Sequence, residues 1–331
     1  MRKLINNPND VVTDMLSGMA QAHPDLLQWS GADTEVIYRK NKKESKVGLI
    51  SGGGSGHEPL HAGYVGEGML DAAVCGNVFA SPSPDRIIEG LRLANSGKGV
   101  LMVIKNYSGD VMNFQMAGEL ANDEGIQTDY VIVKDDVSTE DSNIGTGRRG
   151  IAGTMFVHKI AGAAAEAGKS LSEVKAVAQK TIDNVRTMGM SLSACTIPAN
   201  GKPNFEIADG MCEIGMGIHG EPGIETRPIG SAKEIASILV DHILADMDYN
   251  NSETAVLVNG LGGTPLMELY IMYNEVAKLL DAKNIKIYKS FVGNYTTSLE
   301  MAGCSLSLLK LDDELKKYLD APADTLAWKE K

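Results

Sequence analysis

Short apolar runs alternate with amphipathic segments along the first half of the chain. Residues 84–95 and 110–122 carry apolar side chains at helical spacing, and the first segment opens with Pro84 and Asp85, which favour a helix start. Continuous apolar runs that stop at polar or glycine-rich turns are typical of buried strands, and they occur at 46–50, 99–104 and 128–133. This pattern predicts a mostly parallel sheet covered by helices on both faces.

The second half of the chain has a different order of elements. We expect helices 151–167 and 170–188, a strand from 189, a loop rich in glycine and proline at 200–230, helix 231–247, strand 254–259, helix 265–281, and strands 284–289 and 304–310. With roughly 150 residues per domain as a guide, we predict an α/β fold of two α/β domains, each a mostly parallel sheet flanked by helices. Residues 1–185 would form the N-terminal domain and 186–331 the C-terminal domain.

The composition is that of a globular protein and excludes several classes of function. Of the 331 residues, 43% are hydrophobic and 22% are charged, so the chain has the means to bury a core. The formal net charge of −12 argues against binding to nucleic acid or to an anionic membrane, because both need a basic surface. No apolar run approaches the ~20 residues of a membrane-spanning helix. We therefore expect neither nucleic acid nor a membrane as partner.

The cysteines are too far apart in the sequence to suggest a disulfide framework or a zinc site. They are Cys75, Cys195, Cys212 and Cys304. We expect them to be buried free thiols, which fits a reducing compartment and hence a cytoplasmic location.

A glycine-rich segment, Gly52-Gly-Gly-Ser-Gly56, follows the first predicted strand. A nucleotide-binding P-loop would end in Gly-Lys-Ser/Thr, but His57 and Glu58 stand at those places. We expect a backbone that approaches a small ligand closely, because glycine has no Cβ. The alternative interpretation is a tight turn from strand to helix.

Two further motifs match only formally. His57-Glu-Pro-Leu-His61 has the order of a zinc-protease motif, but Pro59 is incompatible with the regular helix which that motif needs. We predict no metal site there and a structural role for His61. The stretch 145–150 matches a dinucleotide-binding fingerprint but follows polar residues instead of a strand, so it predicts no dinucleotide site.

Two loops concentrate polar residues that are able to perform chemistry. Lys105 and Asp110 lie at the carboxyl end of a predicted parallel strand, where ligands bind in open α/β sheets. They would orient and deprotonate a hydroxyl, although Asp110 could equally cap the following helix. His219 stands between glycines in the long loop 200–230, which would let the imidazole project into a site built elsewhere; the alternative is an incidental histidine in a surface turn.

Taken together, these motifs resemble those of dihydroxyacetone kinases, and among them the substrate-binding K subunits (DhaK). The resemblance extends from Lys3 to Asp312. It is carried by Ser51-Gly-Gly-Gly-Ser-Gly-His-Glu-Pro59, Phe79-Ala-Ser-Pro-Ser-Pro-Asp85, Lys105-Asn-Tyr-Ser-Gly-Asp110, Gly147-Arg-Arg-Gly150, Gly217-Ile-His-Gly-Glu-Pro-Gly223 and Thr264-Pro-Leu-Met-Glu-Leu-Tyr270.

The resemblance implies a division of labour among these residues. His219 would add to the ketone carbon of dihydroxyacetone and form a covalent hemiaminal, which selects short ketoses or aldoses over polyols. Asp110 and His57 would be the acid/base pair, without a decision as to which residue plays which part. The substrate would be held by backbone contacts of Gly54, Ser55 and Gly56 and by hydrogen bonds from Ser81 and Lys105. The site would then form between the two domains.

The resemblance also implies partners. Because this chain stops at Lys331 and has no P-loop, we expect no cofactor or metal on it and a separate L subunit that carries the nucleotide and Mg²⁺. That subunit would be recharged by an M-type protein of the phosphotransferase system, with phosphoenolpyruvate as ultimate donor. A homodimer is also implied. The alternative is a non-catalytic paralogue that senses dihydroxyacetone and co-activates a transcription regulator, but the presence of both His57 and Asp110 favours the enzyme subunit.

Overall fold

The computed structural model describes residues 3–139 and 147–331. The helices are α1 (Val11–Ala22), α2 (Pro84–Ala94), α3 (Ser108–Asp123), α4 (Thr154–Glu166), α5 (Leu171–Asn184), α6 (Ala232–Asp246), α7 (Leu266–Ala282) and α8 (Asp313–Leu319), with a 3₁₀ turn, η1 (Ala62–Tyr64). The strands are β1 (Leu27–Trp29), β2 (Val36–Arg39), β3 (Gly48–Ser55), β4 (Ala72–Val78), β5 (Val100–Lys105), β6 (Thr128–Val133), β7 (Val185–Ser191), β8 (Met211–Ile214), β9 (Glu225–Pro228), β10 (Glu253–Gly260), β11 (Lys286–Gly293), β12 (Gly303–Leu311), β13 (Ala323–Asp324) and β14 (Lys329–Glu330).

The first six-stranded sheet has the order β1-β2-β4-β3-β5-β6. Strands β3, β5 and β6 are parallel, as predicted, β4 is a further parallel strand that the sequence analysis did not predict, and β1 and β2 join one edge in antiparallel fashion. The glycine-rich segment belongs to β3 and is not a turn, because Gly52 and Gly53 continue the pairing with β4. A Cβ at Gly52 would lie 2.3 Å from the carbonyl oxygen of Val74, so only glycine allows this approach.

The second six-stranded sheet has the order β11-β10-β12-β7-β8-β9. The α/β class with two sheets is confirmed, but the expectation that each sheet is mostly parallel is wrong here, since only β10 and β11 are parallel. The reason is that β12 enters from the loop 294–302 without a helical crossover and runs antiparallel between β10 and β7. The predicted loop 200–230 likewise contains the antiparallel pair β8 and β9.

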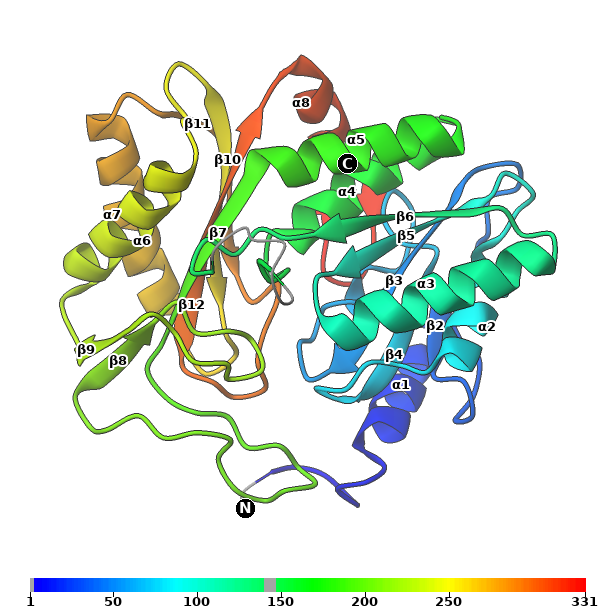
Figure 1. Cartoon of the computed structure of the whole chain (residues 1–331), viewed down its shortest axis with the longest axis horizontal. Helices are drawn as coiled ribbons and strands as arrows, with labels where there is room; N and C mark the ends of the chain where they lie inside the picture. The colour runs from blue at the N-terminus through cyan, green and yellow to red at the C-terminus, as the bar shows by residue number, and fades with distance from the viewer. Residues whose placement is uncertain (1–2, 140–146) are drawn as a thin grey trace.

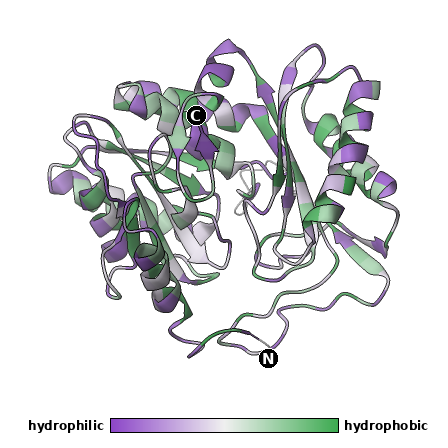
Figure 2. Cartoon of the chain, turned by 180° about the vertical axis from the view of Figure 1, so that it is seen from behind, coloured by the Kyte–Doolittle hydropathy of each residue, from purple (hydrophilic) through white to green (hydrophobic). Residues whose placement is uncertain are grey.

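The sheets and helices form alternating layers, with α4 and α5 between the two sheets (Figure 1). Helices α2 and α3 cover the outer face of the first sheet, and α6 and α7 cover the outer face of the second. Green and purple residues alternate around these outer helices in Figure 2, as expected for helices with one apolar face. Side chains alternate along the strands, so Leu49 faces α4 and α5 while Ile50 faces α2 and α3.

Helix α4 is buried on all sides because it lies between the sheets. Every residue from Thr154 to Ala165 is buried, and most are small or apolar. The predicted helix 170–188 ends earlier than expected, at Asn184, since Val185 begins β7 and pairs with β12. Pairing across the sheet therefore overrides the helical pattern in this segment.

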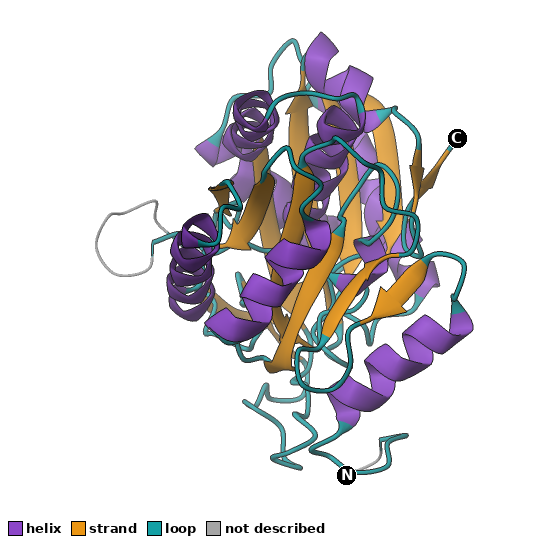
Figure 3. Cartoon of the chain, turned by 90° about the vertical axis from the view of Figure 1, so that its right-hand side faces the viewer, coloured by secondary structure: helices purple, strands orange, loops and turns teal. Residues whose placement is uncertain are grey.

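The carboxyl-terminal segment returns to the first apolar core. Leu315, Tyr318 and Trp328 pack in the same cluster as the side chains of α4. Figure 3 shows the short strands β13 and β14 at this end of the chain. The division into domains 1–185 and 186–331 stays a prediction. Across the described residues, no helix combines the length and the apolar character that crossing a bilayer requires.

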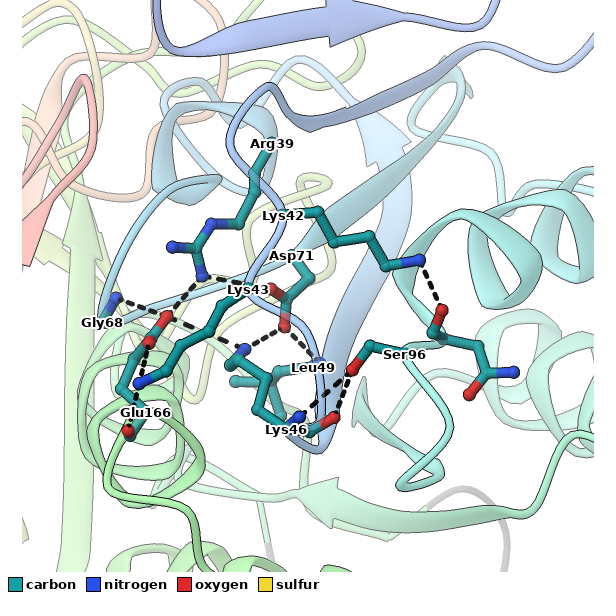
Figure 4. A network of polar contacts seen from close by, with 10 residues as sticks. Arg39, Lys42, Lys43, Lys46, Leu49, Gly68, Asp71, Ser96 and Glu166 are labelled. Atoms are coloured by element: carbon teal, nitrogen blue, oxygen red, sulfur yellow. Dashed lines mark hydrogen bonds and ion pairs between the residues drawn. The ribbon is translucent and has the colours of Figure 1, made fainter.

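A buried ionic network joins the end of α4 to the amino-terminal end of β3 (Figure 4). Nζ of Lys46 lies 2.5 Å and Nη1 of Arg39 lies 3.2 Å from the carboxylate of Asp71. Arg39 also pairs with Glu166, the last residue of α4. The backbone N–H of Leu49 donates a further hydrogen bond to Asp71 at 2.8 Å. The network thus fixes the start of β3 against the end of α4.

Candidate active site

Polar residues gather where parallel strands of the first sheet end. His57 follows β3, Lys105 closes β5, and Asp110 lies in the first turn of α3. The carboxyl ends of parallel strands meet at one edge of a sheet, which is why residues distant in sequence come together here. A loop of the second sheet covers the same edge: the N–H of Leu299 donates to the carbonyl of Gly56 at 2.8 Å.

The imidazole of His219 reaches this edge from the loop between β8 and β9. Its Nε2 lies 3.0 Å from Nε2 of His57, although 162 residues separate the two in sequence. Nδ1 of His57 lies 2.8 Å from the carbonyl oxygen of Thr297. His57 is fully buried, whereas the side chain of His219 keeps 20% of its surface exposed, so only His219 is open to a molecule that enters from solvent.

Aromatic rings enclose the two histidines. The ring of Phe79 stacks on His57 at a centroid distance of 5.0 Å and meets His219 edge-on at 5.2 Å. Tyr107 meets His219 edge-on at 4.7 Å. Burial, followed by the positive charge of Lys105, lowers the pKa of His57 well below its ordinary value. His57 is therefore neutral in this site.

The carboxylate of Asp110 accepts a hydrogen bond from the hydroxyl of Ser81. The interpretation of Asp110 as a helix cap is wrong, because the N-cap of α3 is Tyr107 and makes no side-chain cap bond. Burial raises the pKa of Asp110, an effect that Lys105 and the hydrogen bond from Ser81 partly offset. The carboxyl group is thus a stronger base than an exposed aspartate.

Lys105 is fully buried, and its Nζ has no hydrogen-bond acceptor among the described residues. Burial lowers the pKa of this amine, and the charge of Asp110 is the largest opposing effect. A buried ammonium without an acceptor is costly. An added hydroxyl or carbonyl oxygen would therefore be bound favourably here.

Gly54, Ser55 and Gly56, which were predicted to hold the substrate, make two kinds of contact: close backbone approach and a side-chain hydrogen bond. Gly54 and Gly56 lie against the turn after β4: a Cβ at Gly54 would lie 2.5 Å from the N of Ala80, and one at Gly56 would lie 2.8 Å from the ring of Phe79. The hydroxyl of Ser55 donates to the carbonyl of Gly76 at 2.8 Å and supports the strand. Gly54 and Gly56 thus let the end of β3 lie directly against the turn after β4, beside His57.

Some residues of the site received no role from sequence reasoning. Glu221 accepts hydrogen bonds from Nδ1 of His219 at 3.0 Å and from its backbone N at 2.9 Å. Its place two residues after His219 in the glycine-rich loop was the available signal. Gly53 lies against Asp110: a Cβ added to this glycine would lie 3.2 Å from Oδ2 of Asp110. Thr297 contacts the ring of His57 through its carbonyl, and its hydroxyl donates to the carbonyl of Glu58 at 2.8 Å.

The histidines of the His-Glu-Pro-Leu-His segment point to different partners. His57 contacts His219, whereas Nδ1 of His61 lies 3.0 Å from Nε2 of the buried His158. The formal dinucleotide motif begins at 145–146, outside the described residues. Its end is described: Arg149 donates to Asp136 at 2.8 Å and to the carbonyl of Gly215 at 2.9 Å, which ties it to the strand before the His219 loop.

Comparisons with known proteins agree on the relatives of this chain. The model of the Dak1 domain matches residues 17–327. A PTS-dependent dihydroxyacetone kinase 1, dihydroxyacetone-binding subunit DhaK, from Listeria innocua is 51% identical over 99% of this chain and 100% of its own length. The solved dihydroxyacetone kinase operon co-activator Dha-DhaQ has a TM-score of 0.91 and 38% identity, covering 96% of this chain and 98% of that one.

A larger solved enzyme has the same fold over part of its length. The dihydroxyacetone kinase of C. freundii, in complex with AMP-PNP and Mg²⁺, superposes with a TM-score of 0.90 at 36% identity, and the match covers 99% of this chain but 61% of that enzyme. Family model, sequence relatives and solved structures thus point to one group of proteins. The chain belongs to the Dak1 domain family of dihydroxyacetone kinases, in the group of their DhaK subunits.

Proposed function

We propose that this chain is the dihydroxyacetone-binding subunit of a dihydroxyacetone kinase of the phosphotransferase type. The ketone would be bound as a covalent hemiaminal on His219 while a hydroxyl of the same molecule is phosphorylated to give dihydroxyacetone phosphate. The observation that carries the proposal is the 3.0 Å contact between Nε2 of His219 and Nε2 of His57 beside buried Asp110 and Lys105. This arrangement unites a nucleophile, a proton carrier, a base and a hydroxyl-binding cation.

The proposed steps follow from the atoms at the site. Nε2 of His219 passes its proton to Nε2 of His57 and forms a bond to the ketone carbon, and the C=O π electrons move to oxygen, which takes that proton from His57. Glycerol has no carbonyl, so it cannot form this bond and is rejected. Asp110 accepts the proton of the hydroxyl that attacks phosphorus, a role supported by its raised pKa. Lys105 and Ser81 hold the substrate oxygens, and Gly54, Ser55 and Gly56 form the wall.

The nucleotide and Mg²⁺ are proposed to reside on a separate L subunit. Support comes from the sequence, in which His57 and Glu58 replace the lysine and hydroxyl of a P-loop. The L. innocua relative is named PTS-dependent, which supports an M-type protein and phosphoenolpyruvate as ultimate donor. We also propose a homodimer and a cytoplasmic location; the four cysteines, all buried and free, fit a reducing compartment.

The test uses carbon NMR of carbonyl-labelled dihydroxyacetone mixed with stoichiometric protein. The wild type should move the carbonyl signal to a tetrahedral-carbon position, and His219→Ala should leave it as a ketone. His23→Ala is the matched control, because His23 is exposed in the turn after α1, and it should behave as wild type. A ketone signal in all three proteins would reject the covalent mechanism.

A second function is favoured by the similarity to the co-activator Dha-DhaQ. A sensing protein would form the adduct but pass it to no phosphoryl donor. The discriminating experiment mixes the chain with purified L-type subunits, an M-type protein and phosphoenolpyruvate, and measures dihydroxyacetone phosphate. Product formation supports the kinase subunit, whereas adduct without product across several L-type partners supports the sensor.

A further inference from the structure

Both carboxylate oxygens of Glu221 are used to hold His219. Oε2 accepts the backbone N–H of His219 at 2.9 Å, and Oε1 lies 3.0 Å from ring nitrogen Nδ1. A carboxylate oxygen only accepts, so Nδ1 of His219 carries a proton. The contact therefore fixes the orientation of the ring and leaves Nε2 as the nitrogen that faces the site.

The partners of the neighbouring histidine place a second proton on His219. The carbonyl of Thr297 only accepts, so Nδ1 of His57 is the donor of their 2.8 Å hydrogen bond. His57 is neutral, as its lowered pKa requires, and its Nε2 bears a lone pair. The 3.0 Å contact to Nε2 of His219 then needs a proton from His219. The hydrogen-bond partners thus assign His219 as an imidazolium paired with Glu221.

Charged groups of both signs surround His219, with Lys105 and Arg149 as the cations. Glu221 faces it from its own loop, neutral His57 from the segment after β3, and Asp110 from α3, with Lys105 behind them. Burial alone would raise the pKa of Glu221, but the hydrogen bond and charge of His219, together with Arg149, outweigh burial and lower it to about 2. Glu221 is therefore ionised throughout the neutral range.

Gly217 allows Glu221 and Arg149 to share this position. A Cβ at Gly217 would lie 2.1 Å from Oε2 of Glu221 and 2.5 Å from Nη1 of Arg149. Arg149 is itself held by Asp136, with 2.8 Å between Nε and Oδ2. The N–H groups of His219 thus hold the carboxylate from its own loop, and the charge of Arg149 acts on it from a second loop.

Resting on the proposed covalent function of His219, we propose that Glu221 is a positioning residue that holds the proton on Nδ1 of His219 and is the counter-ion of the cationic adduct. In the reaction, Nε2 of His219 passes its proton to Nε2 of His57 and attacks the ketone carbon with the freed lone pair. The C=O π bond breaks, and the oxygen takes the proton from His57.

The charges balance across this step. The ring of His219 carries hydrogen on both nitrogens before the reaction, and carbon on Nε2 with hydrogen on Nδ1 after it, so it is a cation in both states. The proton that leaves Nε2 ends on the substrate oxygen, and His57 is neutral at the start and at the end. Glu221 neutralises the cation in both states, which matters most where the site is shielded from water.

The first measurement is nitrogen NMR of the substrate-free wild type with labelled histidine, His219→Ala serving to assign the signal. We expect both ring nitrogens of His219 to have protonated-type shifts at neutral pH. A neutral ring in a protein that forms the carbon-NMR adduct would overturn the inference while leaving the proposed function intact. A wild type without adduct would instead reject the proposed function.

The second measurement titrates labelled dihydroxyacetone against pH in Glu221→Gln. This change keeps the shape, removes the charge and replaces one of the two accepting oxygens by an NH2 group, so the adduct should weaken by at least about tenfold, and its loss with rising pH should begin at a lower pH. Glu221→Asp keeps the charge and should restore the wild-type pH profile. Glu225→Gln, on the exposed part of β9, is the matched control and should be unchanged. Identical pH profiles in wild type and Glu221→Gln would overturn the inference.

Discussion

Nδ1 of His57 and the carbonyl oxygen of Thr297 are 2.8 Å apart although 240 residues separate them in the chain. A loop of the second sheet therefore sets the orientation of a ring that follows a strand of the first sheet. Asn259, at the end of β10, holds that loop: its Nδ2 donates to the carbonyl of Thr296 at 2.8 Å, and its Oδ1 accepts from the N–H of Tyr295 and of Thr296 at 2.8 and 2.9 Å.

Asn259→Asp tests this connection. The new carboxylate still accepts from the loop N–H groups but has no donor for the carbonyl of Thr296, and loss of this buried hydrogen bond should cost about 1–3 kcal/mol of stability. Adduct formation should slow, because His57 is held less firmly. Rapid mixing with labelled dihydroxyacetone measures the rate of adduct formation. Asn250→Asp, on an exposed turn, is the control and should change neither the stability nor this rate. An unaltered rate in folded Asn259→Asp would separate the loop from the chemistry.

Asp110→Asn should lower turnover far more than substrate binding. The amide keeps the hydrogen bond to Ser81 in reach but cannot accept a proton, so we expect the rate with the L-type partner to fall by at least about 100-fold. Adduct formation in carbon NMR should change little. Equal losses in binding and in turnover would mean that Asp110 serves substrate binding instead of proton transfer.

The pH dependence of turnover should report the same residue. Burial raises the pKa of Asp110 above its ordinary value of 3.8. A base is active only when unprotonated, so activity should be full above the raised pKa and should decline as the pH falls through it. This acid limb should be absent from the residual activity of Asp110→Asn. Its persistence in the variant would assign the limb to another group.

The fold could be predicted from the sequence where burial alone determines the pattern, and less well where strand pairing does. The strands β3, β5 and β6 are continuous apolar runs buried on both faces, and their predicted positions match. The sequence predicts a loop where the antiparallel strands β8 and β9 lie, because β9 is mostly exposed and has no apolar run to mark it. The end of the helix before β7 was misplaced since the pairing partner of Val185 lies more than a hundred residues away, in β12.

Part of the candidate site can likewise be predicted from the sequence, and part of it depends on three-dimensional geometry. His57, Asp110, Lys105 and His219 carry recognisable chemical groups in unusual glycine contexts, and the structure brings them together. Thr297 contacts the imidazole of His57 through a backbone carbonyl, which no local pattern can identify. Glu221 was visible as a residue of the His219 loop, but its role depends on which ring nitrogen it contacts, and that is a matter of three-dimensional geometry.

Gly53→Ala should damage the site without disturbing the core. Gly53 has φ +154°, and its added Cβ would lie 3.2 Å from Oδ2 of Asp110 and 3.6 Å from Nζ of Lys105. The methyl group would push the carboxylate and the amine apart, so turnover should fall by about tenfold or more. Gly31→Ala is the matched control: Gly31 has φ +105°, and its Cβ would meet nothing within 4 Å, so it should cost stability but not turnover. Equal turnover in the two variants would contradict this role for Gly53.

Asp71→Asn should destabilise the protein strongly. In the network of Figure 4, Arg39 and Lys46 are 8% and 2% exposed, and Asp71 is their shared carboxylate. Removing its charge leaves two buried cations with Glu166 as the remaining carboxylate of the network, which should cost about 3–5 kcal/mol of unfolding free energy. Glu124→Gln breaks the exposed pair with Arg92 and should change the stability far less, because solvent screens this pair. Urea unfolding measures both variants, and the network lies at the opposite end of β3 from His57, so the adduct should still form in folded Asp71→Asn. A stability close to that of Glu124→Gln would mean that apolar packing of α4 between the sheets, and not the ionic network, holds this end of the fold.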